Sequence, residues 1–347
     1  MLFIQPQMTN RNPLIFSTLF FIISLFTFDV YAQNIILTDN NKPSNIRGLS
    51  VVDDKTAWIS GSKGYIATTN DGGKTWVWEQ VKGHEKSDFR DIEAFSDKEA
   101  VIMSSGTPAL VLKTTNGGKT WEEKYHKTDS AYFFDAMDFI NNQRGYILGD
   151  PINSKFFLLE TKDGGETWTK VSNLPDALTG EACFAASGTC LRISSKNLFI
   201  VSGGKNSRMI TFSIYNNIWS YADLPIIHNK ASQGAFSIAI GRRQGIIVGG
   251  DYENDRKTDS IAATYPIRPF PFFNIPQKGP SGFQSCVEHI KGDVFLSTGT
   301  SGSNITHDGG KTWTNIDGAS FNVCGKAKRG KLVLLAGNGG KIAIFKM

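Results

Sequence analysis

The sequence predicts an all-β protein, a single seven-bladed β-propeller of four-stranded blades, from three observations. One octapeptide pattern occurs four times, ending at Trp76, Trp121, Trp168 and Trp313. Its copies lie at nearly regular intervals or at a multiple of that interval, as in a repeat protein. Between them, short apolar segments rich in β-branched residues alternate with Gly-rich turns, and no helical periodicity is sustained.

The spacing of the octapeptides predicts the number of blades. Trp76 and Trp121 are 45 residues apart, Trp121 and Trp168 are 47 apart, and Trp168 and Trp313 are 145 apart. The last interval equals about three repeats of 48 residues. Two degenerate repeats, closing near Trp219 and Tyr265, therefore lie inside it. With the C-terminal segment the chain has seven repeats, each long enough for four strands.

Each repeat shows the same order of segments. An inner strand comes first, at 46–51, 89–95 and 133–140 in the first three repeats. A few polar residues and a strongly apolar second strand follow, and then a Gly-rich turn. The third strand leads into the octapeptide and the fourth strand leaves it. This order is the up-and-down arrangement of a propeller blade.

The two ends of the chain complement each other. Residues 34–38 are expected to form an isolated strand before the first repeat, whereas the last repeat, 320–347, contains three strands. The N-terminal strand can complete the last blade and close the ring, which removes exposed sheet edges. We therefore expect one propeller domain over 34–347.

Residue types within the octapeptide indicate a hairpin turn. The acidic position can accept hydrogen bonds from N–H groups of its own turn, the Gly-Gly pair allows positive φ, and the Trp can pack on a neighbouring hairpin. A structural role is thus favoured over a catalytic one. The residues concerned are Asp71, Trp76, Asn116, Trp121, Asp163, Trp168, Asp308 and Trp313.

The pattern S/T-x-D-x-G-x-T-W resembles the Asp-box, or BNR repeat, of β-propellers. That motif occurs in sialidases, sortilin-type receptors, xyloglucanases and the photosystem II stability/assembly factor family. It implies the propeller hairpin but does not determine function, because function depends on sites carried by a fold.

The N-terminal residues have the features of a targeting segment. Arg11 precedes an uncharged apolar run at 14–28, and Ala32 precedes an expected cleavage site at Gln33. The run is short for a membrane span, so we expect a cleaved signal peptide over 1–32 and a periplasmic or secreted protein without a membrane span. An uncleaved anchor remains the alternative.

Charge and cysteine content narrow the function classes. The net charge is +5 without a Lys/Arg-rich run, which does not indicate nucleic-acid binding.

Cys183 and Cys190 are expected to form a disulfide, whereas Cys286 and Cys324 could pair or remain thiols. No CxxC pair or His/Cys cluster occurs, so we expect neither a metal nor a cofactor.

Candidate binding residues follow from the expected blade geometry. Loops that lead into the inner strands, and turns that join second to third strands, gather on the face opposite the Asp-boxes, where a ligand site is expected. Solvated or mutually paired charges at loop ends are the alternative interpretation. The candidates are Arg47, Arg90, Asp135, Asp150, Glu181, Lys205, Arg208 and Asp251.

Over 34–347 the chain is most similar to the photosystem II stability/assembly factor-like family. That resemblance implies a non-catalytic scaffold whose Arg-bearing face docks another protein. Arg47 and Arg90 match the family pattern and Asp135 departs from it. We therefore expect a monomer that binds a protein or glycan partner and has no catalytic residues.

A sialidase- or xyloglucanase-like glycoside hydrolase is the alternative function. It would need two carboxylates about 5–10 Å apart across a cleft. The candidate carboxylates are present, but their spacing does not single out a pair, and the Arg-Ile-Pro signature of sialidases is absent.

Overall fold

A computed structural model describes residues 1–3, 34–194, 196–267 and 272–347. The signal peptide expected over 1–32 and its cleavage site fall on residues outside this description, apart from the first three. Residues 34–347 belong to one compact unit.

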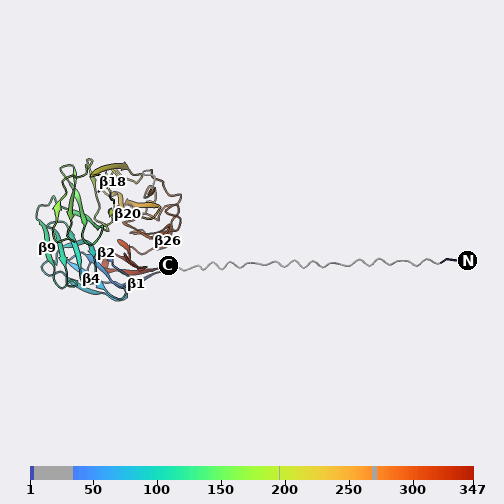
Figure 1. Cartoon of the computed structure of the whole chain (residues 1–347), viewed down its shortest axis with the longest axis horizontal. Helices are drawn as coiled ribbons and strands as arrows, with labels where there is room; N and C mark the ends of the chain where they lie inside the picture. The colour runs from blue at the N-terminus through green and yellow to red at the C-terminus, as the bar shows by residue number, and fades with distance from the viewer. Residues whose placement is uncertain (4–33, 195, 268–271) are drawn as a thin grey trace. The chain divides into compact units, whose positions relative to one another are not determined.

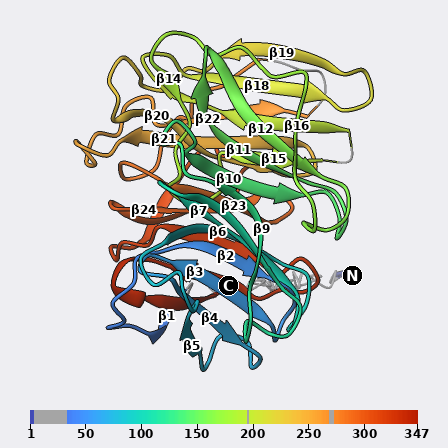
Figure 2. The same cartoon turned by 90° about the vertical axis from the view of Figure 1, so that its left-hand side faces the viewer.

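Seven antiparallel sheets form the blades of a propeller (Figure 1). The inner strands contact one another in a closed ring, in the order β2, β6, β10, β15, β20, β23, β27 and back to β2. Figure 2 shows the sheets of successive blades packed against each other. The predicted seven-bladed all-β fold is confirmed.

Blades 1 to 3 each use four consecutive strands. Blade 1 contains β2 (Ile46–Val51), β3 (Ala57–Gly61), β4 (Tyr65–Thr69) and β5 (Val77–Gln80). Blade 2 contains β6 (Asp88–Ala94), β7 (Ala100–Ser105), β8 (Ala109–Thr114) and β9 (Glu122–Lys127). Blade 3 contains β10 (Phe134–Phe139), β11 (Gly145–Ile152), β12 (Lys155–Thr161) and β13 (Thr169–Lys170).

The remaining blades follow the same plan with local changes. Blade 4 contains β15 (Leu191–Ile193), β16 (Asn197–Val201), β18 (Arg208–Ser213) and β19 (Ile218–Asp223). Blade 5 contains β20 (Gln233–Ile240), β21 (Gln244–Asp251) and β22 (Ala262–Pro266), extended by the short strands β17 (Gly203–Gly204) and β14 (Glu181–Ala182). Blade 6 contains β23 (Cys286–Lys291), β24 (Val294–Gly299), β25 (Gly302–Thr306) and β26 (Thr314–Asp317).

The fifth repeat differs from the expectation. Tyr265, expected to close it, lies in the third strand, β22, and among the residues that the structure describes the outer edge carries an isolated bridge between Thr264 and Asn274. Pro266 and Pro276 flank this segment. Proline cannot donate a backbone hydrogen bond, which disfavours the extension of a strand through these two positions.

Blade 7 closes the ring as the sequence predicts. It contains β27 (Val323–Lys326), β28 (Val333–Ala336), β29 (Ile342–Lys346) and β1 (Asn34–Asp39). Asn34 pairs with Lys346, so the outermost strand comes from the opposite end of the sequence (Figure 1). A three-residue 3-10 turn, η1 (Asn338–Gly340), joins β28 to β29.

In the first Asp-box, Asp71 organises the turn. Its Oδ1 accepts hydrogen bonds from the backbone N–H groups of Lys74 and Thr75, and its Oδ2 accepts one from Thr75 Oγ1 at 2.6 Å. Hydrogen bonds from Thr75 lower the pKa of Asp71 to about 2. Gly72 and Gly73 adopt φ of 77° and 81°, which explains the glycine pair.

The other three boxes repeat this geometry. Asp163 and Asp308 accept hydrogen bonds from the threonine four residues later. In the second box the amide of Asn116 instead donates to Thr120 Oγ1 at 2.7 Å. These hydrogen bonds all lie within the turn of their own box.

Each Asp-box packs against the preceding blade. A Cβ on Gly73 would lie 2.8 Å from Leu334 Cδ2 of blade 7. Trp121 makes an edge contact with Trp58 of blade 1, with ring centroids 6.3 Å apart. Burial is graded, since Trp313 and Trp168 are 1% and 8% exposed whereas Trp76 and Trp121 are partly exposed. The boxes therefore lock neighbouring blades together.

Among the described residues, no helix is long and apolar enough to span a bilayer.

Candidate functional site: the mouth pocket

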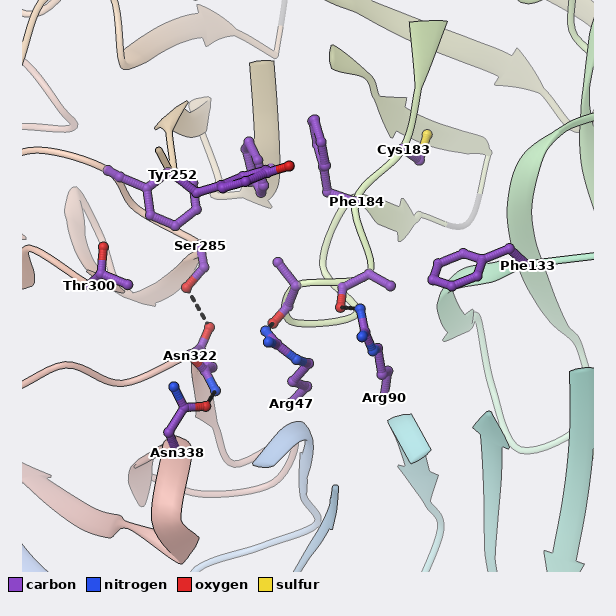
Figure 3. A pocket seen from close by; sticks show the side chains of 14 residues that line it. Arg47, Arg90, Phe133, Cys183, Phe184, Tyr252, Ser285, Thr300, Asn322 and Asn338 are labelled. Atoms are coloured by element: carbon purple, nitrogen blue, oxygen red, sulfur yellow. Dashed lines mark hydrogen bonds between the residues drawn. The ribbon is translucent and has the colours of Figure 1, made fainter. Parts of the chain in front are cut away.

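A pocket of about 450 Å³ opens on the face opposite the Asp-boxes. We call it the mouth pocket. Its walls come from loops leading into inner strands and from turns joining second to third strands, as predicted (Figure 3). It is lined by Arg47, Arg90, Phe133, Cys183, Phe184, Ala185, Ala186, Phe236, Tyr252, Phe283, Ser285, Thr300, Asn322 and Asn338.

β-Bulges place three of these side chains. The pairing register shifts between Ile46 and Gly48, between Phe89 and Asp91, and between Ala235 and Ser237. Arg47, Arg90 and Phe236 are the extra residues at these shifts. A bulge redirects the side chain of its extra residue, and here all three line the same pocket.

The loop that leads into blade 4 forms the floor of the mouth pocket. Arg47 Nη1 donates a hydrogen bond to the carbonyl oxygen of Ala186 at 3.2 Å, and Arg90 Nη1 donates to that of Ala185 at 3.3 Å (Figure 3). Ser187 Oγ donates to the carbonyl oxygen of Ser285 at 2.8 Å. The loop is thus tied to blades 1, 2 and 6.

Gly188 allows this loop to approach the inner strand of blade 2. Its φ is +68°, and a Cβ there would lie 2.2 Å from Asp91 Oδ2. Both the backbone conformation and the missing side chain are needed at this position.

The two arginines make one side of the pocket electropositive. Burial and the neighbouring Arg90 guanidinium lower the pKa of Arg47, and the Asp88 carboxylate offsets this in part. Arg90 Nε pairs with Asp88 Oδ2 at 2.7 Å. The pair therefore favours an anionic group between or beside the two guanidinium groups.

The opposite side of the pocket is aromatic. Phe184 stacks on Phe236 with centroids 3.7 Å apart, and Phe283 meets Phe236 edge-on at 4.7 Å. Tyr252 also meets Phe236 edge-on and is 48% exposed. Figure 3 shows Tyr252 and Phe133 on opposite sides of the pocket, with Phe184 between them in this view. Such a wall suits apolar side chains of a ligand.

Amide and hydroxyl groups complete the rim next to Arg47. Asn322 Nδ2 donates to the backbone carbonyl of Ile46 at 2.9 Å and to Asn338 Oδ1 at 2.8 Å. Ser285 Oγ donates to the carbonyl oxygen of Asn322 at 2.7 Å (Figure 3). These bonds hold the blade 6 and blade 7 parts of the rim against blade 1.

Four of the predicted binding residues are placed elsewhere. Arg208 and Glu181 form a buried ion pair, with Arg208 Nε 2.8 Å from Glu181 Oε1 and side chains 8% and 0% exposed. Asp251 is buried and accepts a hydrogen bond from Gln233 Nε2 at 2.8 Å. Lys205 is exposed and is not part of the pocket lining. Arg208, Glu181 and Asp251 therefore stabilise the loops in which they lie and do not line the pocket.

Asp135 and Asp150 lie behind the wall of the pocket. Asp150 Oδ1 accepts a hydrogen bond from the backbone N–H of Cys183, and burial raises the pKa of Asp150 to about 6. Asp135 is also an extra residue at a bulge, but its side chain is fully buried. Burial, with Asp150 nearby, raises the pKa of Asp135 well above its usual value, which favours the neutral acid.

The cysteine prediction needs correction. Cys183 and Cys190 are buried free thiols in this structure, so the expected disulfide is not formed. The Cys183 thiol donates instead to the carbonyl oxygen of Val201 at 3.7 Å. Cys286 and Cys324 are also free, with their sulfur atoms 3.7 Å apart.

The aromatic wall was not predicted from the sequence. Phe236 occupies the same bulge position in blade 5 as Arg47 in blade 1 and Arg90 in blade 2. An alignment of the inner strands extended to the fifth repeat would have found it. Phe184 lies in the inserted loop, where an apolar side chain could equally have been a core residue.

Comparisons with known proteins agree with the Asp-box prediction. The family model described as photosynthesis system II assembly factor YCF48 matches residues 31–129 and 77–187. None of the curated proteins compared with the chain matches it. The chain is an Asp-box-like β-propeller that resembles this assembly factor.

Solved structures show the same fold. YCF48 bound to a D1 peptide aligns with a TM-score of 0.66 at 16% identity, over 92% of this chain and 96% of that one. YCF48 from Cyanidioschyzon merolae aligns at 0.62 and 15% identity, over 90% and 98%. The GH74 enzyme of Niastella koreensis aligns at 0.59 and 10% identity, over 86% of this chain and 51% of that one.

Proposed function

We propose that this chain is a non-catalytic, assembly-factor-like propeller that holds a segment of a partner protein in the mouth pocket. The observation that carries the proposal is the paired anchoring of Arg47 and Arg90 on adjacent loop carbonyls, opposite an aromatic wall. The pocket would take an anionic group at the arginines and apolar or aromatic side chains at the wall.

Two further observations support this reading. The resemblance to the YCF48 family is consistent with binding or assembly rather than catalysis, and one similar structure is of YCF48 bound to a D1 peptide. The lining also contains no Asp or Glu among its fourteen residues. Glycoside hydrolysis would require a pair of carboxylates.

The test measures the binding of fluorescent peptides that carry Asp or Glu beside Phe, by anisotropy, with the full chain. We expect the Arg47→Ala/Arg90→Ala variant to bind about tenfold more weakly. The matched control is Arg242→Ala/Arg243→Ala, which removes the same charge from an exposed turn between the first and second strands of blade 5. If both variants lost the same peptide affinity, the loss would be due to the change in net charge alone, and the proposal would be refuted.

A parallel screen tests the alternatives at the same site. Binding of oligosaccharides, but not peptides, with the same dependence on Arg47 and Arg90 would replace the protein partner by a glycan. Glycoside turnover that is lost in Asp150→Asn would replace the binding function by hydrolysis.

We also propose that the chain is exported. The apolar run at 14–28 is followed by Ala32, a small residue of the kind that precedes a signal-peptide cleavage site. N-terminal sequencing of the protein from an envelope or culture fraction tests this. A first residue at Gln33 is expected, and an intact N-terminus in the cytosolic fraction would contradict it.

A further inference from the structure

Blade 7 is built without an Asp-box turn between its outer strands. Its third and fourth strands, β29 and β1, are not consecutive in the sequence. In blade 1, Thr68 pairs with Val77, the residue after Trp76. In blade 7, Ile344 pairs with Ile36, the residue after Ile35. Ile35 therefore stands where the Asp-box tryptophan of a blade would stand.

Contacts of the next boxes support this equivalence. The second glycine of box 1, Gly73, lies over Leu334, which pairs with Ile344. The second glycine of box 2, Gly118, lies over Trp58, which pairs with Thr68. The strands of blades 7 and 1 therefore pair in the same register. Ile35 of blade 7 and Trp76 of blade 1 occupy equivalent positions.

A groove of about 870 Å³ lies where the Asp-box hairpin of blade 7 would pack. We call it the blade 7 groove. Its floor includes the buried side chains of Ile290, Val333 and Phe345, and the half-buried Leu332 and Ile344. Ile290 belongs to blade 6, so the groove lies at the same kind of blade junction that the tryptophans fill elsewhere.

Positive charge surrounds this apolar floor. Lys291, Lys326, Lys331 and Lys346 contribute to the lining, with Asp54 as its one acidic side chain. Asp54 Oδ1 already accepts hydrogen bonds from the N–H groups of Leu332 and Lys331, which lower the pKa of this carboxylate. The lysines are thus available to carboxylates of a ligand.

We propose that the blade 7 groove docks a protein segment that carries an aromatic side chain flanked by carboxylates. The other blade junctions show what such a site accepts, since Trp313 enters one of them and is 1% exposed. Ile35 is smaller than tryptophan and leaves that space to a ligand. The lysine rim selects acidic neighbours of the aromatic residue.

The site is independent of the mouth pocket. The groove lies where Asp-box turns pack, whereas the mouth pocket opens on the opposite face. The measurement therefore uses the Arg47→Ala/Arg90→Ala chain, in which the mouth pocket is disabled. A failure of one proposal then leaves the other testable.

The probe is a fluorescein-labelled peptide of sequence EDGGETWE, followed by anisotropy. We expect saturable binding that weakens about tenfold when the peptide tryptophan is replaced by alanine. Ile35→Trp, which fills the groove with the chain's own side chain, should abolish binding and raise Tm. Lys331→Glu/Lys346→Glu should weaken binding about tenfold, and the control Arg242→Glu/Arg243→Glu should not.

Three results would overturn the proposal. The first is an Ile35→Trp variant that binds the peptide with unchanged affinity while its Tm shows that it is folded. The second is a dimer, seen by sedimentation, that Ile35→Trp dissociates, because the groove would then hold a second copy of the chain. The third is binding to phosphatidylglycerol vesicles that depends on the lysines but not on Ile35, which would indicate a membrane surface.

Discussion

Arg47 donates a hydrogen bond to the carbonyl oxygen of Ala186, a residue 139 positions later in the sequence. This bond joins the first blade to the loop that leads into the fourth. The same loop receives Arg90 of the second blade at the preceding carbonyl. The shape of the mouth pocket therefore depends on a loop held by side chains from distant parts of the chain.

Gly188→Ala should disturb this loop. The added Cβ would meet the Asp91 carboxylate, and φ of +68° is unfavourable for alanine. We expect a loss of about 1–3 kcal/mol in the free energy of unfolding, measured by urea denaturation. Peptide binding at the mouth pocket should weaken as well. Gly292→Ala is the control, since its φ of +51° is strained but no atoms lie near its Cβ. Equal binding by both variants would contradict the role of the loop.

The Asp-box tryptophans should differ in their contribution to stability. Trp313→Ala should cost about 3–5 kcal/mol because the side chain is 1% exposed. Trp76→Ala should cost less, since Trp76 is partly exposed. Chemical denaturation of the two variants tests the order. A larger loss for Trp76 would mean that burial does not determine the contribution of these residues.

Asn116→Asp should stabilise the second Asp-box. The new carboxylate would accept a hydrogen bond from Thr120 as Asp71 accepts one from Thr75, and this bond should lower its pKa, as in Asp71. A lowered folded-state pKa gives stability that is present above the unfolded-state pKa and is lost as the pH falls through the folded-state value. Tm should therefore rise at pH 7, with the gain disappearing in strong acid. A Tm gain that is independent of pH would exclude this cause.

Asp135→Asn should raise stability at neutral pH. Burial raises the folded-state pKa of Asp135 well above the ordinary value of an aspartic acid. Between the unfolded and folded pKa values the native state binds more protons, so stability falls as the pH rises through this window. Asparagine has no such titration. Thermal melts from pH 4 to pH 8 should show a growing difference in Tm between variant and wild type, and parallel curves would contradict a buried neutral acid.

Local patterns made the fold predictable from the sequence. The Asp-box turns depend on residues within one octapeptide, so Asp71 and its hydrogen-bond partners could be predicted together. Arg47 and Arg90 could be placed because they occupy one position of a repeat. The neutralisation of Glu181 by Arg208 could not, because both carry charges at loop ends and only folding shows which charges meet. The free thiols of Cys183 and Cys190 likewise depend on packing rather than spacing.

The pairing of β1 with β29 also has a consequence for synthesis. Asn34 emerges from the ribosome long before its partner Lys346, which lies 312 positions later in the sequence. Contacts so distant in sequence form slowly, since a long loop must close first. Until then β1 exposes unpaired backbone groups together with the apolar side chains of Ile36 and Leu37, which are exposed even in the native state. We therefore expect the interval before ring closure to be the stage at which the growing chain is most prone to aggregate and most dependent on chaperones.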